Sequence, residues 1–349
     1  MRNPKLISLG YAVPTFTFTQ DDIFKTLGYP HGFSRIFNAA QIDRRHFVVP
    51  IQDAMGRSFQ EQQELYQVHA VDLSTAALAK ALDGKSSDNL GLLTYSTCTG
   101  FAPGPTVSDF LAQVFHLPSD LEVNNLSSQG CESSFPGLKR CYDFTALHGK
   151  PSAAIACELC SLTYYPEPEG HPDPENDYEV LRAMAIFGDA ASCAILGFDD
   201  NPRHPEILDF VSHLDTSYIK ELGYVWRDGR LRVKLSKSVP DIAVKLVTIA
   251  IKKLLERNSL EIADIAYWVI HPPGAIVLDK LRDTLPLPEE KLKYSRKALR
   301  ENGNCSSATV GIVGKLLMQE ETNPQGYLIM ANVGPGMCAN ASLMRFGVS

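Results

Sequence analysis

Three short stretches of the sequence carry side chains that together could handle thioester chemistry. Cys131 stands among small residues in SSQGCESSFPG, His271 ends the apolar run of WVIHPPG, and Asn304 lies within ENGNCSSAT. A thiolate is a nucleophile, an imidazole transfers protons, and an amide N–H donates to a developing oxyanion. Taken singly, each is more typical of structure: a buried cysteine, a turn histidine and a helix N-cap.

The surroundings of these residues predict where each one lies. Cys131 is expected at a strand-to-helix junction, because Gly130 permits a tight turn and Pro136 is tolerated only near a helix start. A helix N-terminus there favours a thiolate, with His271 as its imidazolium partner. His271 is expected at a strand end, where ligands bind in α/β folds. A fourth stretch, NVGPGM at 332–337, predicts a loop whose backbone approaches a ligand closely.

The order of elements predicts an α/β fold in two similar halves. Apolar runs predict short strands at 92–95, 153–157, 268–270 and 326–331, and helical spacing predicts helices at 70–82, 239–257 and 308–319. Two successive rounds of strand, helix and strand divide the chain into residues 1–200, carrying Cys131, and 201–349, carrying His271 and Asn304. Residues 166–177, rich in Pro and acidic residues, predict an exposed loop.

Composition excludes several classes of protein. The 349 residues include 44% hydrophobic and 21% charged residues, the balance of an ordinary soluble globular protein. A net charge of −7 argues against nucleic-acid and anionic-membrane partners. No apolar stretch is long enough to span a membrane, and residues 1–10 lack signal-peptide features, so a cytoplasmic location is expected. The 8 cysteines are scattered, which indicates free thiols and no metal site.

In this order, the motifs resemble those of the type III (chalcone-synthase-like) polyketide synthases of the thiolase superfamily. The resemblance runs from about residue 6 to residue 346. It rests on the motifs GC at 130–131, FGD at 187–189, HPPG at 271–274, GNCSS at 303–307 and GPG at 334–336, with further similarity in IDRRHF at 42–47, ELCSLT at 158–163 and LSKSVPD at 235–241. The ordered set is specific, although no single motif is.

The resemblance implies a thiolase-like αβαβα five-layer fold, a homodimer and decarboxylative Claisen condensation. Cys131 would carry the acyl starter, while His271 and Asn304 would stabilise the enolate that malonyl thioester leaves after losing CO2. Cyclisation to a pyrone or aromatic ring would follow. The substrates would be acyl-CoA and malonyl-CoA or carrier-protein thioesters, without a cofactor. The implied substrate pocket comprises Phe187, Cys98, Thr163, Val233, Ser306, Gly334, Pro335 and Gly336.

The sequence departs from the family at several positions. Val233 replaces a second aromatic gatekeeper, which predicts a wider tunnel and a longer or bulkier acyl chain. Of a basic trio that binds the CoA phosphates only Arg35 remains, so either Arg44 or Arg45 compensates or an acyl carrier protein is the donor. Pro103 stands where a side chain often reaches the partner's cavity. Glu132 would raise the pKa of Cys131 if it pointed inward.

Four alternatives share parts of this signature. A ketosynthase III-like enzyme would condense once and release a β-ketoacyl thioester, and a carrier-protein-dependent synthase would join two β-ketoacyl chains into a pyrone. The LSKSVP and GNCSS stretches favour the polyketide branch. A catalytically dead partner on the same fold usually lacks a chemical residue, and here all three are present. A cysteine hydrolase would release free acid without forming a carbon–carbon bond.

Overall fold

The computed structural model describes residues 2–54, 57–101, 103–163, 178–227 and 229–347. The loop expected at 166–177 lies outside these ranges. Among the described residues, nine strands form one sheet in the order β11 (Ile265–Ile270), β12 (Gly326–Gly334), β13 (Cys338–Phe346), β8 (Glu206–Leu214), β1 (Lys5–Ala12), β7 (Asp189–Gly197), β6 (Ser152–Leu159), β4 (Leu92–Thr97) and β5 (Glu122–Ser127). The pairing of Lys5 with Glu206 joins β1 to β8.

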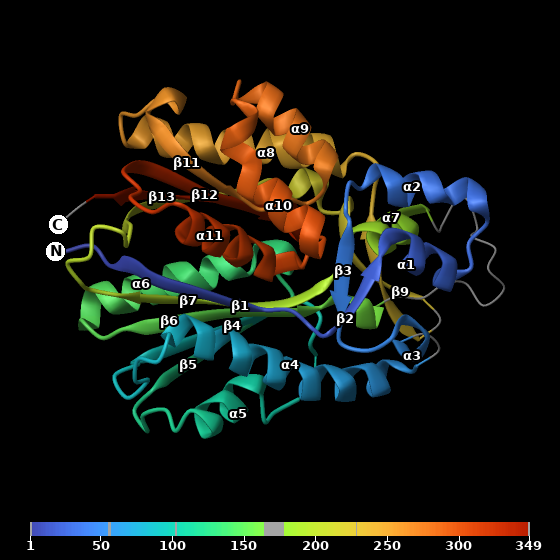
Figure 1. The fold of residues 1–349 in the computed structure, drawn as a ribbon, viewed down its shortest axis with the longest axis horizontal. Coiled ribbons are helices and arrows are strands. Elements are labelled where there is room, and N and C mark those ends of the chain that lie inside the picture. Colours follow the sequence, from blue (N-terminus) through green and yellow to red (C-terminus); the bar gives the residue numbers. More distant parts are fainter. Residues whose placement is uncertain (1, 55–56, 102, 164–177, 228, 348–349) are drawn as a thin grey trace.

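Helices separate and cover the two halves of this sheet, giving the five alternating layers seen in Figure 1. One outer layer contains α8 (Val239–Arg257) and α9 (Ala275–Thr284), and the other contains α4 (Phe59–Leu82) and α5 (Val107–Val114). The central layer contains α6 (Ser134–His148) and α11 (Thr309–Glu320), which lie between the two halves of the sheet. Another helix, α10 (Lys293–Asn302), packs on α11. The strands of one half come from residues before 200 and those of the other from residues after it. The two-domain division itself stays a prediction.

A cap lies at the end of the molecule opposite both termini (Figure 1). It consists of β2 (Phe16–Thr19), α1 (Gln20–Leu27), α2 (Ser34–Ala39), β3 (Arg44–Phe47), α3 (Ile51–Ala54), α7 (Tyr178–Ile186), β9 (Leu222–Arg227) and β10 (Arg230–Leu235). Its apolar core includes Phe37, Phe47 and Phe187, and Cys131 belongs to the same cluster. The cap therefore supplies the apolar cover over the cysteine.

Local sequence explains these elements. Every residue of β4 and β7 is buried, because helices cover both faces of the sheet, and their sequences are correspondingly apolar or small. The expected strands fall within observed strands, the helix 239–257 has the expected bounds, and the helix expected at 308–319 is α11, which begins and ends one residue later. The helix expected at 70–82 begins earlier, at Phe59, since Ser58 and Glu61 form a capping box before a polar first half.

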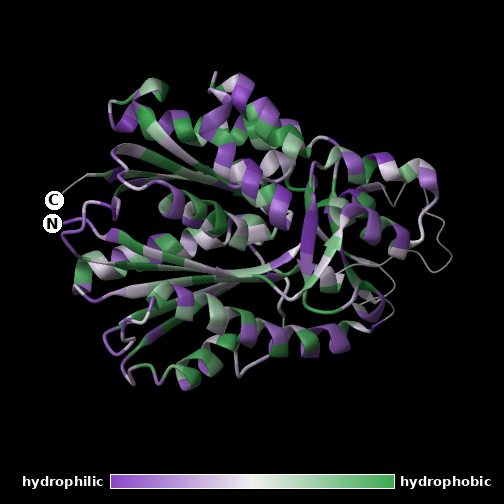
Figure 2. Ribbon diagram, viewed as in Figure 1, coloured by the Kyte–Doolittle hydropathy of each residue, from purple (hydrophilic) through white to green (hydrophobic). Residues whose placement is uncertain are grey.

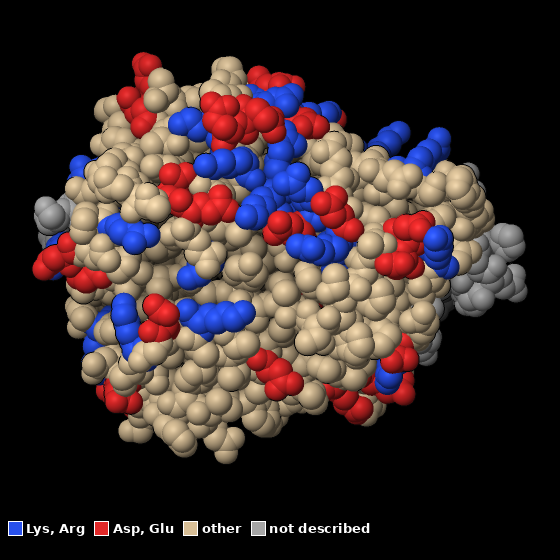
Figure 3. All heavy atoms as spheres, in the orientation of Figure 1, with Lys and Arg blue, Asp and Glu red and all other residues tan. Residues whose placement is uncertain are grey.

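The surface is mixed in character. Apolar residues gather on the faces turned toward the sheets, and hydrophilic ones on the outside (Figure 2). Figure 3 shows lysines and arginines interleaved with acidic residues. Ion pairs within the described residues include those of Arg296 with Asp279 and of Lys297 with Glu320. No helix within the described residues is both long enough and apolar enough to cross a bilayer.

Candidate active site

Cys131 lies in a tight turn between β5 and α6. The chain passes through the short helical segment Gly130–Glu132, where Gly130 has φ 62° and the nearby Ser128 has φ 66°. A β-carbon at Gly130 would lie 2.2 Å from Cδ of Pro335, so only glycine fits. The turn therefore packs closely against the GPG stretch at 334–336, at the end of β12. The thiol of Cys131 is buried.

Backbone contacts fix Asn304 beside two other motifs. Its N–H donates to the carbonyl of Ile186 at 2.8 Å, and its own carbonyl accepts from the N–H of Gly188 at 3.0 Å. Its side-chain Nδ2 donates to the carbonyl of Pro273 at 3.2 Å. Asn304 therefore joins the FGD stretch to the loop that follows His271, and residues far apart in the sequence meet there.

Ser306 links this asparagine to the cysteine. Its N–H donates to Oδ1 of Asn304 at 2.8 Å, and its hydroxyl donates to Sγ of Cys131 at 3.4 Å. The same hydroxyl lies 3.4 Å from Sγ of Cys98. Ser306 has φ 49°, a strained conformation for a residue with a side chain. Ser306 thus lies beside the thiol, and its place in a substrate pocket stays a prediction.

A buried carboxylate supports this arrangement. Glu158, at the end of β6, accepts from the hydroxyl of Ser307 at 2.5 Å and from the N–H of Cys98 at 3.0 Å. Glu158 belongs to the ELCSLT stretch at 158–163, but the sequence analysis predicted no role for it. A signal was available, since a glutamate within a buried strand requires polar partners.

His271 directly follows β11 and is buried. Its N–H donates to the carbonyl of Ala331 at 2.8 Å, which continues the pairing of β11 with β12. Neither Nδ1 nor Nε2 has a hydrogen-bond partner among the described residues, although the side chain is 1% exposed. Buried polar groups are usually paired, so this imidazole is available to hydrogen-bond a substrate.

Burial controls protonation in the site. Burial raises the pKa of Cys131 to about 12, although the hydrogen bond from Ser306 opposes this. Glu158 and Glu132 raise that pKa further, and burial lowers the pKa of His271 to about 3. Both shifts favour the uncharged forms, a thiol and a neutral imidazole. The thiolate and imidazolium expected from the sequence stay a prediction, since burial shifts both pKa values against the charged forms.

A small pocket of about 20 Å³ adjoins the thiol. It is lined by Cys98, Gly130, Cys131, Cys160, Phe187, Leu222, Gly223, Tyr224, Val233, Ser306 and Pro335. Three residues expected in the substrate pocket do not line it. Thr163 instead donates from its hydroxyl to the carbonyl of Cys160 at 2.7 Å, while Gly334 and Gly336 lie on either side of Pro335.

The aromatic ring missing at position 233 has a replacement on the neighbouring strand. Val233 on β10 pairs directly with Tyr224 on β9, and the Tyr224 hydroxyl lies 3.5 Å from Sγ of Cys98. Tyr224 therefore places an aromatic ring beside Val233 in the lining of the small pocket, and the wider tunnel stays a prediction. The sequence did not indicate Tyr224, because its proximity to Val233 depends on the register of a hairpin.

A second cavity, of about 560 Å³, opens near the first. Its lining includes the cations Arg35, Arg182 and Lys237 together with the loop residues Pro273 and Gly274. Ile186 and Leu235 line this cavity, whereas Phe187 and Val233, close by in the chain, line the small pocket. Neighbouring residues of the same segments thus line the two cavities, and Asn304 is hydrogen-bonded to Ile186 and Pro273 of the larger one and to Ser306 of the smaller one.

Arg44 and Arg45, the two arginines expected to compensate for the lost basic trio, do not line this cavity. Arg45 is fully buried, and its guanidinium donates to the carbonyls of Met184 and Phe187 at 2.5 and 2.8 Å. Arg44 is exposed but does not line the cavity. Neighbouring residues of a strand face opposite sides, which separates the two arginines. Sequence reasoning missed Arg182 and Lys237, because both are far from Arg35 in the sequence and approach it only in the folded chain.

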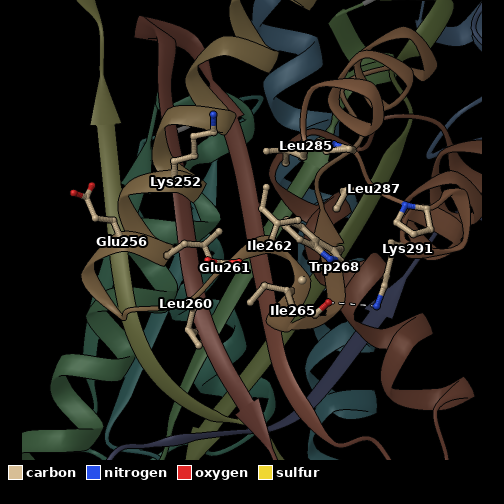
Figure 4. A pocket seen from close by; sticks show the side chains of 14 residues that line it. Lys252, Glu256, Leu260, Glu261, Ile262, Ile265, Trp268, Leu285, Leu287 and Lys291 are labelled. Atoms are coloured by element: carbon tan, nitrogen blue, oxygen red, sulfur yellow. Dashed lines mark hydrogen bonds between the residues drawn. The ribbon is translucent and has the colours of Figure 1, made fainter.

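The most voluminous of these cavities, about 780 Å³, lies elsewhere. Figure 4 shows it between the end of α8 and the segment after α9, with Trp268 and Ile265 among its lining and Lys291 bonded to the carbonyl of Ile265. None of Cys131, His271 and Asn304 lines it. The chemistry-bearing motifs therefore meet at the smaller cavities.

Comparison with known proteins supports the family resemblance that the sequence motifs indicated. Residues 220–346 match the family model described as chalcone and stilbene synthases, C-terminal domain. The chain is 28% identical over 325 residues to a 1,3,6,8-tetrahydroxynaphthalene synthase of Streptomyces peucetius subsp. caesius, covering 89% of this chain and 83% of that protein. It is 24% identical to a putative chalcone synthase of Bacillus subtilis, covering 98% of each.

A solved structure shares the fold. The crystal structure of 1,3,6,8-tetrahydroxynaphthalene synthase from Streptomyces coelicolor A3(2), described as a bacterial type III polyketide synthase, superposes with a TM-score of 0.86. It is 22% identical and covers 99% of this chain and 100% of that chain. The fold class expected from the motifs is confirmed.

Proposed function

We infer that this chain, a type III polyketide synthase by sequence and fold, is an acyltransferase that condenses a malonyl thioester with a Cys131-bound acyl starter. The observation that supports the site is the meeting of three distant segments: the Cys131 turn, Asn304 with Ser306, and the loop after His271. Incubation with acyl-CoA starters and malonyl-CoA, followed by product masses, tests this function. Release of free acid without a new carbon–carbon bond would instead indicate a hydrolase.

The proposed mechanism begins with acyl transfer. As the Cys131 sulfur attacks the starter thioester, its proton passes to His271, which is neutral and therefore able to accept it. The C–S bond to CoA breaks, and the leaving thiolate takes that proton from the imidazolium. This order suits a site in which burial holds the free thiol protonated.

Condensation follows in the emptied donor site. Malonyl thioester loses CO2, and its carbonyl oxygen becomes the oxyanion of an enolate. Nδ2 of Asn304 and an N–H of His271 would donate to that oxyanion, which lowers the barrier to decarboxylation. The enolate carbon attacks the acyl carbon on Cys131, a carbon–carbon bond forms, and the Cys131 C–S bond breaks. Relatives named as tetrahydroxynaphthalene and phloroglucinol synthases support subsequent cyclisation to an aromatic ring.

The cavity with three cations is the proposed binding site for the CoA phosphates. Replacing Arg182 with glutamine should raise KM for malonyl-CoA about tenfold with little change in kcat, because a charge-assisted hydrogen bond is worth roughly 1.5–3 kcal/mol. Malonyl-pantetheine lacks the nucleotide phosphates, so its KM should not change. Steady-state kinetics with both donors measure this, and Arg44→Gln serves as the exposed control. Equal KM values for Arg182→Gln and wild type would favour a carrier-protein donor.

Tyr224 is proposed to restrict the enzyme to small starters. Replacing it with alanine should raise kcat/KM for an eight-carbon acyl-CoA about tenfold or more, since each accommodated methylene is worth roughly 1–3 kcal/mol. Tyr224→Phe keeps the ring and should retain the wild-type starter range. Product masses from a starter series provide the measurement. An unchanged range in Tyr224→Ala would mean that another side chain limits the pocket.

The homodimer also stays a proposal. Phe59, Phe101 and Trp226 form a surface cluster of aromatic rings, with centroids of Phe59 and Trp226 5.1 Å apart. Trp226 is 64% exposed, and Phe101 lies two residues before Pro103, the position expected to approach a partner. Exposed aromatic residues of this kind favour a protein interface. A light-scattering mass twice the 38.4 kDa of the chain would support it.

A further inference from the structure

A line of polar side chains crosses three strands and ends at the Cys131 turn. Ser212 on β8 pairs directly with Asn340 on β13, which pairs in turn with Asn332 on β12. The Ser212 hydroxyl donates to Oδ1 of Asn340 at 2.6 Å, and Nδ2 of Asn340 donates to Oδ1 of Asn332 at 3.2 Å. These three residues are called the polar line below. Both asparagines are buried, where such polar groups require partners.

The inner end of the polar line holds the backbone around the nucleophile. Nδ2 of Asn332 donates to the carbonyl of Cys131 at 3.4 Å and to that of Glu132 at 3.2 Å. Nδ2 of Asn340 also donates to Oε2 of Glu132 at 2.5 Å. The side-chain oxygens and N–H groups of both asparagines are thus used, which fixes their orientation.

These contacts answer which way Glu132 points. Its carboxylate lies against Asn340, and Glu132 does not line the pocket beside Cys131. A β-carbon at Gly334 would lie 2.6 Å from Cγ of Glu132, so the side chain occupies space that a glycine leaves. Glu132 therefore anchors the turn to the ends of β12 and β13.

The turn needs such an anchor because its backbone is strained. Ser128 has φ 66°, a strained conformation for a residue with a side chain, and such conformations persist only where their surroundings hold them. Moving a reacting atom by about 1 Å can cost on the order of a hundredfold in rate. An element that fixes the peptide planes after Cys131 therefore has a direct effect on acyl transfer.

We propose that Asn332, Asn340 and Glu132 are positioning residues, which hold the Cys131 turn in its reactive geometry through the polar line. The inference rests on the proposed role of Cys131 as the acyl-carrying nucleophile. It adds no group that touches the substrate. It assigns a function to an unusual Glu-Asn pair that the condensation mechanism does not use.

The test measures acyl loading and thiol reactivity separately from overall turnover. Asn332→Ala should slow single-turnover acylation of Cys131 roughly tenfold or more, while KM for malonyl-CoA changes less than about twofold. The N–H of Cys131 favours its thiolate, so a loosened turn should raise the thiol pKa and shift iodoacetamide alkylation to higher pH. Asn258→Ala is the matched control, because it removes an amide with two hydrogen bonds far from the turn.

Exchanging the amide of Asn340 and the carboxylate of Glu132 distinguishes a positioning role from a general effect on stability. Asn340→Asp places two carboxylates together and should also slow acylation about tenfold. Adding Glu132→Gln restores an amide-to-carboxylate hydrogen bond and should recover part of the rate, because the introduced aspartate still cannot donate to Oδ1 of Asn332. Unchanged acylation in Asn332→Ala, an equal loss in Asn258→Ala, or no recovery in the double variant would overturn the inference. Failure of the proposed function would appear differently, as acylation that persists in Cys131→Ala.

Discussion

Cys131→Ala is expected to abolish acyl loading and to lower condensation by a thousandfold or more. Loss of a covalent nucleophile typically has effects of this order, because the intermediate can no longer form. Exposure of the protein to a starter acyl-CoA, followed by intact-protein mass measurement, reports the covalent adduct directly. Wild-type protein should gain one acyl group and the variant none.

The control for this experiment is a second buried cysteine remote from the pocket. Cys141 lies in α6 with its thiol 3.6 Å from the hydroxyl of Thr94, and it does not line the pocket beside Cys131. Cys141→Ala should load the acyl group normally. An adduct on Cys131→Ala that maps to another thiol, such as Cys98, would show that the nucleophile has been assigned incorrectly.

Periodicity and motif order predicted much of the fold, because the relevant signals are local. Buried strands such as β4 and the amphipathic helix α8 have their signatures within a single segment. The tight turn at Cys131 was likewise indicated by Gly130. The extended start of α4 was not, since its polar first half has no apolar stripe and only its capping box indicates the true beginning.

Features that depend on contacts between segments were predicted poorly. The replacement of the missing aromatic ring by Tyr224 requires the register of β9 and β10. The inward direction of Arg45 could have been inferred from the period of a strand, which places Arg44 and Arg45 on opposite faces. The direction in which burial shifts the pKa of Cys131 could not be derived from the sequence, because burial depends on the contacts of the folded chain.

Asn304→Ala is expected to lower malonyl decarboxylation a hundredfold or more while leaving acyl loading of Cys131 close to wild type. One oxyanion donor typically contributes about 3 kcal/mol, and in the proposed mechanism Asn304 acts only on the enolate. Its Nδ2 already faces the loop after His271, where it donates to the carbonyl of Pro273. Release of CO2 from labelled malonyl-CoA measures the first effect, and intact-protein mass measures the second.

Comparing acyl loading with malonyl decarboxylation distinguishes the role of His271 from that of Asn304. His271 is proposed to accept the thiol proton and to stabilise the enolate, so His271→Ala should impair both loading and decarboxylation. Asn304→Ala should impair only the second, provided that Ser306 keeps its place without the Oδ1 that accepts its N–H. Equal losses of loading and decarboxylation in Asn304→Ala would mean that Asn304 organises the site rather than stabilising the enolate. Asn304→Asp would then separate these possibilities, because it keeps the acceptor for Ser306 but removes the donor.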